Sequence, residues 1–218
     1  MTGNGLKVKI CGIKDTPTAE LIVDLGASFI GFVCYDKSPR NISLTEYKAI
    51  SDILGERVKT IIVTVAPSDE FLEAMLKLGA PDYLQIHGKI DTRRLNFIKS
   101  KYRLKLITAI SHQELKQELI DDLESLSEHV LIDSASQVEA SGYGGSGLIF
   151  DWEKLAKFKF TKPYFLSGGL NISNIKEAIE LTRVSYVDLS SGLEEVRGVK
   201  SRDKIIEFFN YLRANEIL

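Results

Sequence analysis

The chain has 218 residues, 44% of them apolar and 27% charged, and its formal net charge is −2. This length and composition suit one soluble domain with a substantial core. The small net charge gives no electrostatic footprint for nucleic acid or for an anionic membrane, and no apolar run approaches the roughly 18 residues that would cross a bilayer.

The N-terminal residues 1–5 lack the basic and apolar parts of a signal peptide, so we expect a cytoplasmic protein. The two cysteines, Cys11 and Cys34, are far apart in the sequence, and the three histidines do not cluster. A disulfide is not expected in a reducing compartment, and the spacing of these residues does not match a zinc site. We therefore expect no structural metal.

Segments rich in β-branched and apolar residues recur along the chain, most of them about 22 to 24 residues apart. That spacing accommodates a short loop, a helix of two to three turns and a turn back. Helical periodicity fills the intervals, as in 19–25 and 71–78, and Gly26 and Gly79 follow where a left-handed helix cap is expected. The predicted strands are 7–11, 29–33, 60–64, 83–87, 104–109, 130–133, 164–167 and 186–190.

Strands that read as continuous apolar runs and alternate with helices indicate a parallel sheet covered by helices. Eight such units without a Gly-x-Gly-x-x-Gly fingerprint after the first strand favour a closed barrel over an open dinucleotide-binding sheet. We therefore predict an α/β fold, a (β/α)₈ TIM barrel, as a single domain over 1–218. The two longest gaps, 36–57 and 134–162, are expected to lie partly in loops on the catalytic face.

Two ionisable residues end predicted strands on opposite sides of the barrel: Cys11 on the first strand and Asp133 on the sixth. A thiol and a carboxyl that face each other suit general acid–base chemistry. The alternatives are that Cys11 is a small buried hydrophobe and that Asp133 caps a turn. As a base at the barrel mouth, Cys11 should reach solvent and exist partly as thiolate, whereas Cys34 is expected to be structural.

Two further polar residues follow strands. Arg40 lies in the loop after the second strand and His87 ends the fourth. Arg40 is either a substrate contact or a solvated loop charge. His87 contacts substrate or holds its loop by a hydrogen bond.

Glycines and serines gather in the loops after the last three strands, at Gly144–Gly147, Gly168–Gly169 and Ser190–Gly192. Glycine lets backbone N–H groups approach an anion closely, and a phosphate site after the seventh and eighth strands recurs in this fold. One glycine pair could serve only a turn. Three in consecutive loops indicate a phosphorylated ligand.

Seven segments at these strand ends form an ordered set of motifs that covers residue 8 to about 210. They are Lys9-Ile10-Cys11-Gly12, Ser38-Pro39-Arg40, Leu84-Gln85-Ile86-His87-Gly88, Leu131-Ile132-Asp133-Ser134, Gly145-Ser146-Gly147 with Phe150-Asp151-Trp152, Leu166-Ser167-Gly168-Gly169-Leu170, and Val187-Asp188-Leu189-Ser190-Ser191-Gly192-Leu193-Glu194. This set closely resembles the phosphoribosylanthranilate isomerase family of tryptophan biosynthesis.

The resemblance implies an Amadori rearrangement of N-(5-phosphoribosyl)anthranilate, an aminoaldose, to the aminoketose carboxyphenylamino-deoxyribulose phosphate, without cofactor or metal. It implies that Asp133 is the general acid that opens the furanose ring and that Cys11 is the base that removes the C2′ proton. Arg40 would pair with the anthranilate carboxylate.

The resemblance also implies the other binding groups. The phosphate would be held by the backbone around Gly145, Gly147, Gly169, Ser191 and Gly192, next to Gly168 and Ser190. Lys9 and His87 match family positions near the substrate without a defined role. Asp188 matches a position that acts behind the groups in contact with substrate.

The chain departs from the family at two places. Ser201 stands where many members have Asp, and serine caps a helix about as well. Asn41-Ile42-Ser43, after Arg40, lacks the aromatic residue associated with the family and leaves the aryl pocket's wall undefined.

Two other functions are compatible with a phosphate-binding barrel. A histidine-pathway aminoaldose isomerase resembles a design with Asp at the end of the first strand, which Cys11 argues against. A non-catalytic phosphate-binding barrel would be expected to lack Cys11 or Asp133, and both are present. The sequence leaves open whether the chain is a monomer or a homodimer.

Overall fold

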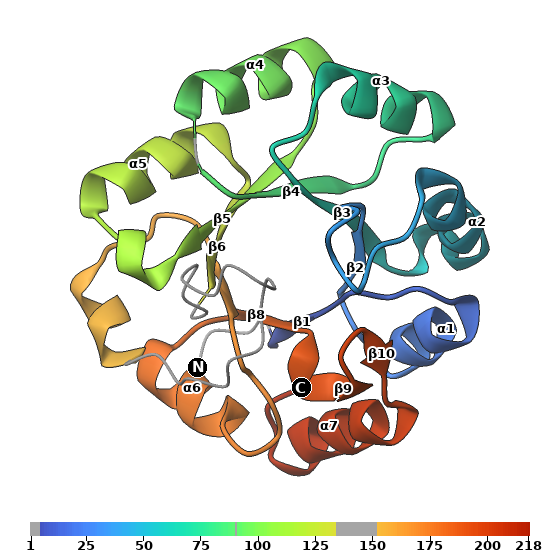
Figure 1. Ribbon diagram of the computed structural model, residues 1–218. Helices are drawn as coiled ribbons and strands as arrows, with labels where there is room; N and C mark the ends of the chain where they lie inside the picture. The colour runs from blue at the N-terminus through green and yellow to red at the C-terminus, as the bar shows by residue number, and fades with distance from the viewer. Residues whose placement is uncertain (1–4, 90, 134–151) are drawn as a thin grey trace.

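The computed structural model describes residues 5–89, 91–133 and 152–218. Eight parallel strands form a closed barrel in sequential order (Figure 1), so the predicted TIM barrel is confirmed. The strands are β1 (Lys7–Cys11), β2 (Phe29–Val33), β3 (Lys59–Val65), β4 (Tyr83–His87), β5 (Leu106–Ser111), β6 (His129–Asp133), β7 (Phe165–Ser167) and β8 (Tyr186–Leu189).

Three predicted strands, β1, β2 and β4, have the bounds expected from the sequence, and the others shift by one or two residues. The largest shift is in β5, which begins at Leu106 instead of Leu104. The preceding helix runs to Tyr102 and ends on Arg103 in the left-handed conformation. Leu104 is therefore part of the turn back to the barrel.

Helices surround the barrel on its outside (Figure 1). The predicted helix 19–25 begins earlier, at Thr16, because Asp15 accepts a hydrogen bond from the Thr18 N–H and Pro17 stands in the first turn. Between β6 and β7 the described residues contain a short 3₁₀ helix, η3 (Trp152–Lys157). The α-helices are α1 (Thr16–Asp24), α2 (Leu44–Leu54), α3 (Asp69–Leu78), α4 (Thr92–Tyr102), α5 (Gln117–Leu126), α6 (Ile175–Thr182) and α7 (Arg202–Ala214).

Alternation along the strands separates two cores. Residues such as Ile10, Ile30 and Ile62 point outward and pack with the helices in the larger core. Cys11, Ile61, Leu131 and their neighbours form a smaller cluster inside the barrel. A side chain is thus assigned to the lumen when it shares strand parity with this inner cluster.

Aromatic rings fill the N-terminal end of the lumen. Phe29, Tyr83, His129, Phe165 and Tyr186 are each the first residue of their strand. The Phe29 and Phe165 ring centroids are 5.3 Å apart, and those of His129 and Tyr186 are 5.1 Å apart. Because packed rings occupy this end, polar chemistry is confined to the opposite end, where the strands finish.

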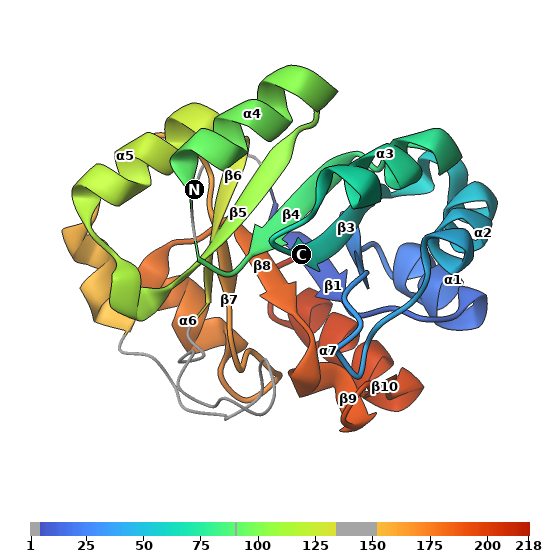
Figure 2. The same ribbon diagram turned by 45° about the horizontal axis from the view of Figure 1, so that its top comes forward.

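A two-stranded hairpin, β9 (Glu194–Val196) with β10 (Val199–Lys200), separates β8 from α7 and projects beside that helix (Figure 2). Its turn residue Gly198 packs against the loop after β2, and a Cβ there would lie 2.6 Å from the Pro39 carbonyl oxygen. The hairpin is followed by Ser201, whose hydroxyl accepts a hydrogen bond from Lys204 N–H at the start of α7. The predicted serine cap is confirmed. None of the helices in the described ranges is long and apolar enough to span a membrane.

Candidate active site

The C-terminal ends of the strands carry the polar residues that the sequence singled out. Register aligns Lys9 of β1 with Asp188 of β8, and Asp133 of β6 with Ser167 of β7. Cys11 belongs to the lumen cluster, and Asp133 shares strand parity with Leu131 of that cluster. Cys11 and Asp133 therefore both face the lumen at the barrel mouth, the end where the strands finish. In the closed barrel, β7 and β8 lie between β6 and β1.

Lys9 and Asp188 form an ion pair inside the barrel. Lys9 Nζ lies 2.8 Å from Asp188 Oδ2, and the lysine has 0% exposure. Burial lowers the pKa of Lys9, but the Asp188 carboxylate and the Cys11 sulfur more than offset this effect, so the pKa is raised. Lys9 therefore remains an ammonium, and it lies deeper in the lumen than Cys11, by one lumen-facing position of β1.

Cys11 does not have the exposure expected of it. It is 7% exposed, and burial raises the pKa of its thiol despite the opposing effect of Lys9. The expectation of a solvent-reaching cysteine that is partly thiolate is wrong for the free protein, because burial outweighs the nearby cation. Cys34 is buried in the outer core, where burial raises its pKa to about 12. That agrees with a structural role.

Space for Cys11 and Lys9 comes from a glycine on the neighbouring strand. Gly31 of β2 is aligned with Cys11. A Cβ at Gly31 would lie 2.9 Å from Cys11 Sγ and 3.2 Å from Lys9 Cε. Any larger residue would displace one of the two side chains. The thiol and the lysine stem therefore occupy adjoining space over Gly31.

His87 ends β4 half-buried at the same end of the barrel. Its Nε2 is 2.5 Å from Gln85 Nε2, so the ring nitrogen accepts from the amide. Burial lowers the pKa of His87 to about 4, and the Lys9 charge adds to that effect. The ring is therefore neutral at physiological pH. Its hydrogen bond to Gln85 supports the interpretation that His87 is held in place from within its own strand.

Arg40 is not a solvated loop charge. The residue is 6% exposed, and its guanidinium donates from Nε to Glu194 Oε1 at 2.6 Å and from Nη2 to Glu194 Oε2 at 2.8 Å. Its side chain also packs over Gly12, directly after Cys11, where a Cβ would lie 2.6 Å from Arg40 Cδ. Arg40 is thus fixed beside the end of β1 by a bidentate pair.

Glu194 and Lys200 were not among the residues that the sequence singled out as site residues. Lys200 Nζ donates to Glu194 Oε1 at 2.9 Å and to the Ser190 carbonyl oxygen at 3.0 Å. The Ser190 hydroxyl in turn donates to the Cys11 carbonyl oxygen at 3.1 Å. These bonds tie the hairpin and the β8 loop to the end of β1. Glu194 lies within the last sequence motif, but its bond to Arg40 joins distant parts of the chain and leaves no local pattern.

The loops after β7 and β8 pack directly against each other. Gly168 and Gly169 have positive φ angles of 93° and 66°. A Cβ at Gly192 would lie 2.1 Å from the Leu170 carbonyl oxygen, so only glycine fits there. Ser191 and Gly192 begin the 3₁₀ turn η4 (Ser191–Leu193), whose first N–H groups have no acceptor within the turn. Gly145 and Gly147, also expected at this site, lie outside the described residues.

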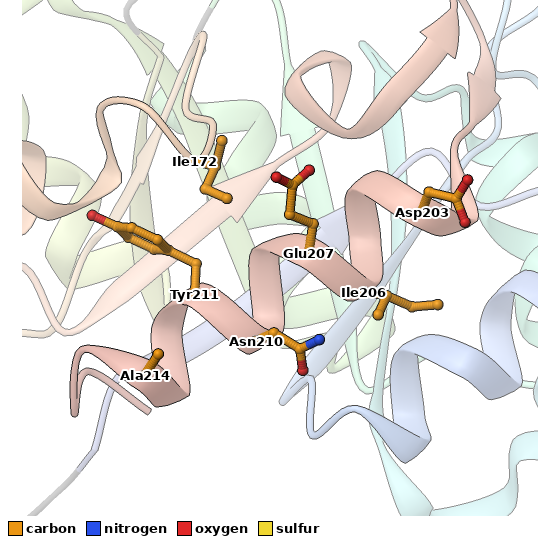
Figure 3. Close-up of a pocket in the computed structure, with 7 residues that line it drawn as sticks. All are labelled: Ile172, Asp203, Ile206, Glu207, Asn210, Tyr211 and Ala214. Atoms are coloured by element: carbon orange, nitrogen blue, oxygen red, sulfur yellow. The ribbon is translucent and has the colours of Figure 1, made fainter.

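An open groove of about 540 Å³ runs along the outer face of α7 (Figure 3). It is lined by Ile172, Asp203, Ile206, Glu207, Asn210, Tyr211 and Ala214. No residue that the sequence singled out for the site lines this groove. In the described ranges, no group of three or more His, Cys, Asp or Glu side chains is arranged to hold a metal ion.

A closed (β/α)₈ barrel with ionisable side chains and glycine loops at the ends of its strands defines the class of TIM-barrel enzymes. The family model for N-(5′-phosphoribosyl)anthranilate isomerase matches residues 8–211. The chain belongs to this family, whose members are aldose–ketose isomerases of tryptophan biosynthesis.

Two relatives show the extent of the match. The N-(5′-phosphoribosyl)anthranilate isomerase of Agrobacterium fabrum (strain C58 / ATCC 33970) is 37% identical, over 93% of each chain. That of Chelativorans sp. (strain BNC1) is 35% identical, over 96% of each chain. The likeness therefore extends over nearly the whole length of both proteins.

Solved structures agree. The phosphoribosylanthranilate isomerase from Thermus thermophilus is 28% identical with a TM-score of 0.81, over 96% of this chain and 100% of that one. A phosphoribosylanthranilate isomerase in complex with reduced 1-(o-carboxyphenylamino)-1-deoxyribulose 5-phosphate is 29% identical with a TM-score of 0.73, over 96% and 99%. The family and activity predicted from the motifs are confirmed, and the histidine-pathway and non-catalytic alternatives are not favoured.

Proposed function

We propose that this chain isomerises N-(5′-phosphoribosyl)anthranilate by general acid–base catalysis between Cys11 and Asp133. The observation that carries the proposal is their placement: both face the lumen at the C-terminal ends of β1 and β6, in a chain that matches the family over residues 8–211. A thiol and a carboxyl in these positions can act on neighbouring atoms of one bound sugar.

Asp133 is the general acid in this mechanism. Its proton goes to the furanose ring oxygen, the bond between that oxygen and C1′ breaks, and the anthranilate nitrogen forms a Schiff base with C1′. Asp133 is partly exposed at the end of β6, which is compatible with direct contact with substrate.

Cys11 is the general base. Its thiolate removes the proton from C2′, and the resulting enolamine becomes the aminoketose when C1′ gains a proton and the 2′-hydroxyl loses one. The product is therefore an isomer of the substrate, and the chemistry needs neither a redox partner nor a metal. Because burial raises the pKa of Cys11, its thiolate is a scarce but strong base at neutral pH.

The rest of the site binds the two ends of the substrate. Arg40, held by Glu194 through Nε and Nη2, presents its remaining N–H donors to the anthranilate carboxylate. The backbone of Gly169, Ser191 and Gly192, together with Gly145 and Gly147, binds the phosphate, with Gly168 and Ser190 shaping those loops. The tight contact between Gly192 and Leu170 supports this arrangement.

The chain acts in the cytoplasm as a single-domain monomer or homodimer in this proposal. Its membership in a biosynthetic family supports the location. Among the structural relatives is a solved structure of generated monomers of the dimeric enzyme from Thermotoga maritima. Either assembly is therefore compatible with the fold.

A fluorescence assay that follows consumption of freshly made phosphoribosylanthranilate tests the activity. The purified chain should consume it at a rate proportional to enzyme concentration. Cys11→Ser should lose activity by orders of magnitude, because a hydroxyl is a far poorer proton acceptor. Failure of the folded wild-type chain to exceed spontaneous decay would refute the activity, and a fully active Cys11→Ser variant would refute the role of Cys11.

A further inference from the structure

The barrel lumen contains a fully buried ammonium at a place where TIM barrels are filled by branched apolar side chains. Lys9 has 0% exposure, and its partner Asp188 has 5%. Replacing a buried ion pair with apolar residues is often neutral or stabilising. A contribution to stability alone therefore does not explain why the ion pair is present.

The geometry relates this ammonium to the sulfur of Cys11. Lys9 and Cys11 are two residues apart on the same face of β1, and their side chains adjoin over Gly31. Asp188 Oδ2 fixes Lys9 Nζ at 2.8 Å from the neighbouring strand. Asp188 Oδ1 is buried and has no hydrogen-bond partner among the described residues, so the carboxylate is held chiefly by this lysine.

The other cationic side chains near Cys11 are bonded to groups other than its thiol. Lys200 of β10 is bonded to Glu194 and to Ser190. Arg40, beside Gly12, is paired with Glu194 through two bonds. His87 of β4 is neutral at physiological pH. Asp188 of β8 is the anion that acts on Cys11, and Lys9 is the cation with the largest influence on it.

We propose that Lys9 is a positioning residue for the reaction: its ammonium, oriented by Asp188, stabilises the Cys11 thiolate that accepts the C2′ proton. This inference rests on the proposed role of Cys11 as the base. The sulfur is anionic before proton transfer and neutral after it, while Lys9 keeps its charge and its bond to Asp188 throughout. Lys9 thus supports the thiolate without contacting the substrate.

The test measures the pH midpoint of Cys11 alkylation by iodoacetamide, followed by mass spectrometry of the Cys11 peptide. A Cys34→Ala background removes the second thiol. Lys9→Met combined with Asp188→Asn removes both charges and leaves no unpaired buried ion. Asp188→Asn alone keeps the ammonium and removes the anion. Lys59→Met with Asp82→Asn is the control, since that pair, 2.8 Å apart, spans the starts of β3 and β4 at the other end of the barrel.

The double variant should shift the midpoint upward, because Lys9 adjoins Cys11 over Gly31 and has the larger influence on the thiol. The rise should be smaller than the roughly 1 to 3 pH units for losing a lone opposite charge, because the simultaneous loss of Asp188 offsets part of it. Asp188→Asn should shift it downward, because the remaining ammonium is no longer opposed. The control pair should leave the midpoint unchanged. In the double variant kcat near neutral pH should fall much more than KM rises, because the substrate-binding groups are intact.

An unmoved or lowered midpoint in a double variant with native circular dichroism would overturn the proposal. Should that variant fail to fold, Asp188→Asn decides, and an unchanged or raised midpoint there overturns it. The test distinguishes a failure of the Lys9 proposal from a failure of the mechanism that uses Cys11 as the base. An unmoved midpoint together with an inactive Cys11→Ser variant would refute only the positioning role of Lys9. An active Cys11→Ser variant would refute the role of Cys11 as the base.

Discussion

Arg40 lies in a loop, yet its guanidinium is buried and paired with a carboxylate of its own chain. The pair with Glu194 leaves fewer donors for a ligand, but it fixes the plane of the guanidinium. Lys200 also bonds to Glu194, so the three side chains carry one net positive charge. The proposed contact with the substrate carboxylate is therefore made by a cluster that is both oriented and positive.

We expect Arg40→Ala to raise KM by about tenfold or more while kcat changes less, in line with the loss of hydrogen bonds to a charged group. Arg40→Lys should recover part of the affinity, because an ammonium lacks the planar fork. Steady-state kinetics provide the measurement, with Arg197→Ala, an exposed arginine of the same hairpin, as the control. An unchanged KM in both Arg40 variants would show that Arg40 does not bind substrate.

The hairpin β9–β10 is the element that fixes the mouth of the barrel, and Glu194 is its anchor. Burial raises the pKa of Glu194, but Arg40, Lys200 and the Gly198 N–H more than offset this and hold the pKa at about 2, below its ordinary value of 4.5. The folded form thus prefers the carboxylate. The stability that Glu194 contributes is present above pH 4.5 and is lost as pH falls toward about 2.

We therefore expect the wild-type free energy of unfolding to fall steeply over that acidic window, and the slope to be smaller in Glu194→Gln, which cannot titrate. Urea denaturation at a series of pH values measures this. Exposed Glu195→Gln is the control on the same strand. Equal slopes in wild type and Glu194→Gln would show that the Arg40–Glu194–Lys200 cluster does not couple folding to pH.

The loops after β7 and β8 form a second element, and their contact leaves no room at Gly192. Inorganic phosphate should inhibit competitively and raise the melting temperature, since a ligand of the native state stabilises it. Gly192→Ala should weaken both effects by forcing the loops apart. Gly5→Ala, where an added Cβ meets nothing within 4 Å, should leave both unchanged. If phosphate at tens of millimolar neither inhibits nor stabilises wild type, these loops do not hold the phosphate.

Elements were predictable where local pattern decides them. β1, β2 and β4 are short segments whose central residues are buried, and their bounds match those read from the sequence. The apolar periodicity that begins at Ala19 predicts a later start for α1 than the structure has, because Asp15 caps the helix. Before β7 the described residues from 152 onward contain the 3₁₀ helix η3.

At the scale of the whole molecule, barrel closure brings distant strand ends into one site. The sequence could predict that Cys11 and Asp133 lie at the same end of the barrel, because the fold dictates where the ends of the strands meet. The bonds of Arg40 to Glu194 and of Lys9 to Asp188 could not be predicted, since each depends on side-chain reach between remote segments. The burial of Cys11 was missed for the same reason: exposure at the mouth depends on how neighbouring loops pack.

The closed barrel also explains which of its two ends carries the site. Rings of Phe29, Phe165 and Tyr186 fill one end of the lumen, and the ion pair Lys9–Asp188 lies between them and Cys11. In the proposed mechanism substrate therefore approaches Cys11 and Asp133 from the opposite end of the barrel. The central claim is that these two residues share one proton-transfer reaction.

The most direct measurement of that claim is kcat for Asp133→Asn, with circular dichroism and melting temperature showing that the variant is folded. An amide keeps the shape of the side chain but cannot donate the carboxyl proton. We expect kcat to fall by about 10²-fold or more, the range for losing a positioned proton donor. A folded Asp133→Asn variant that turns over phosphoribosylanthranilate at close to the wild-type rate would contradict the mechanism.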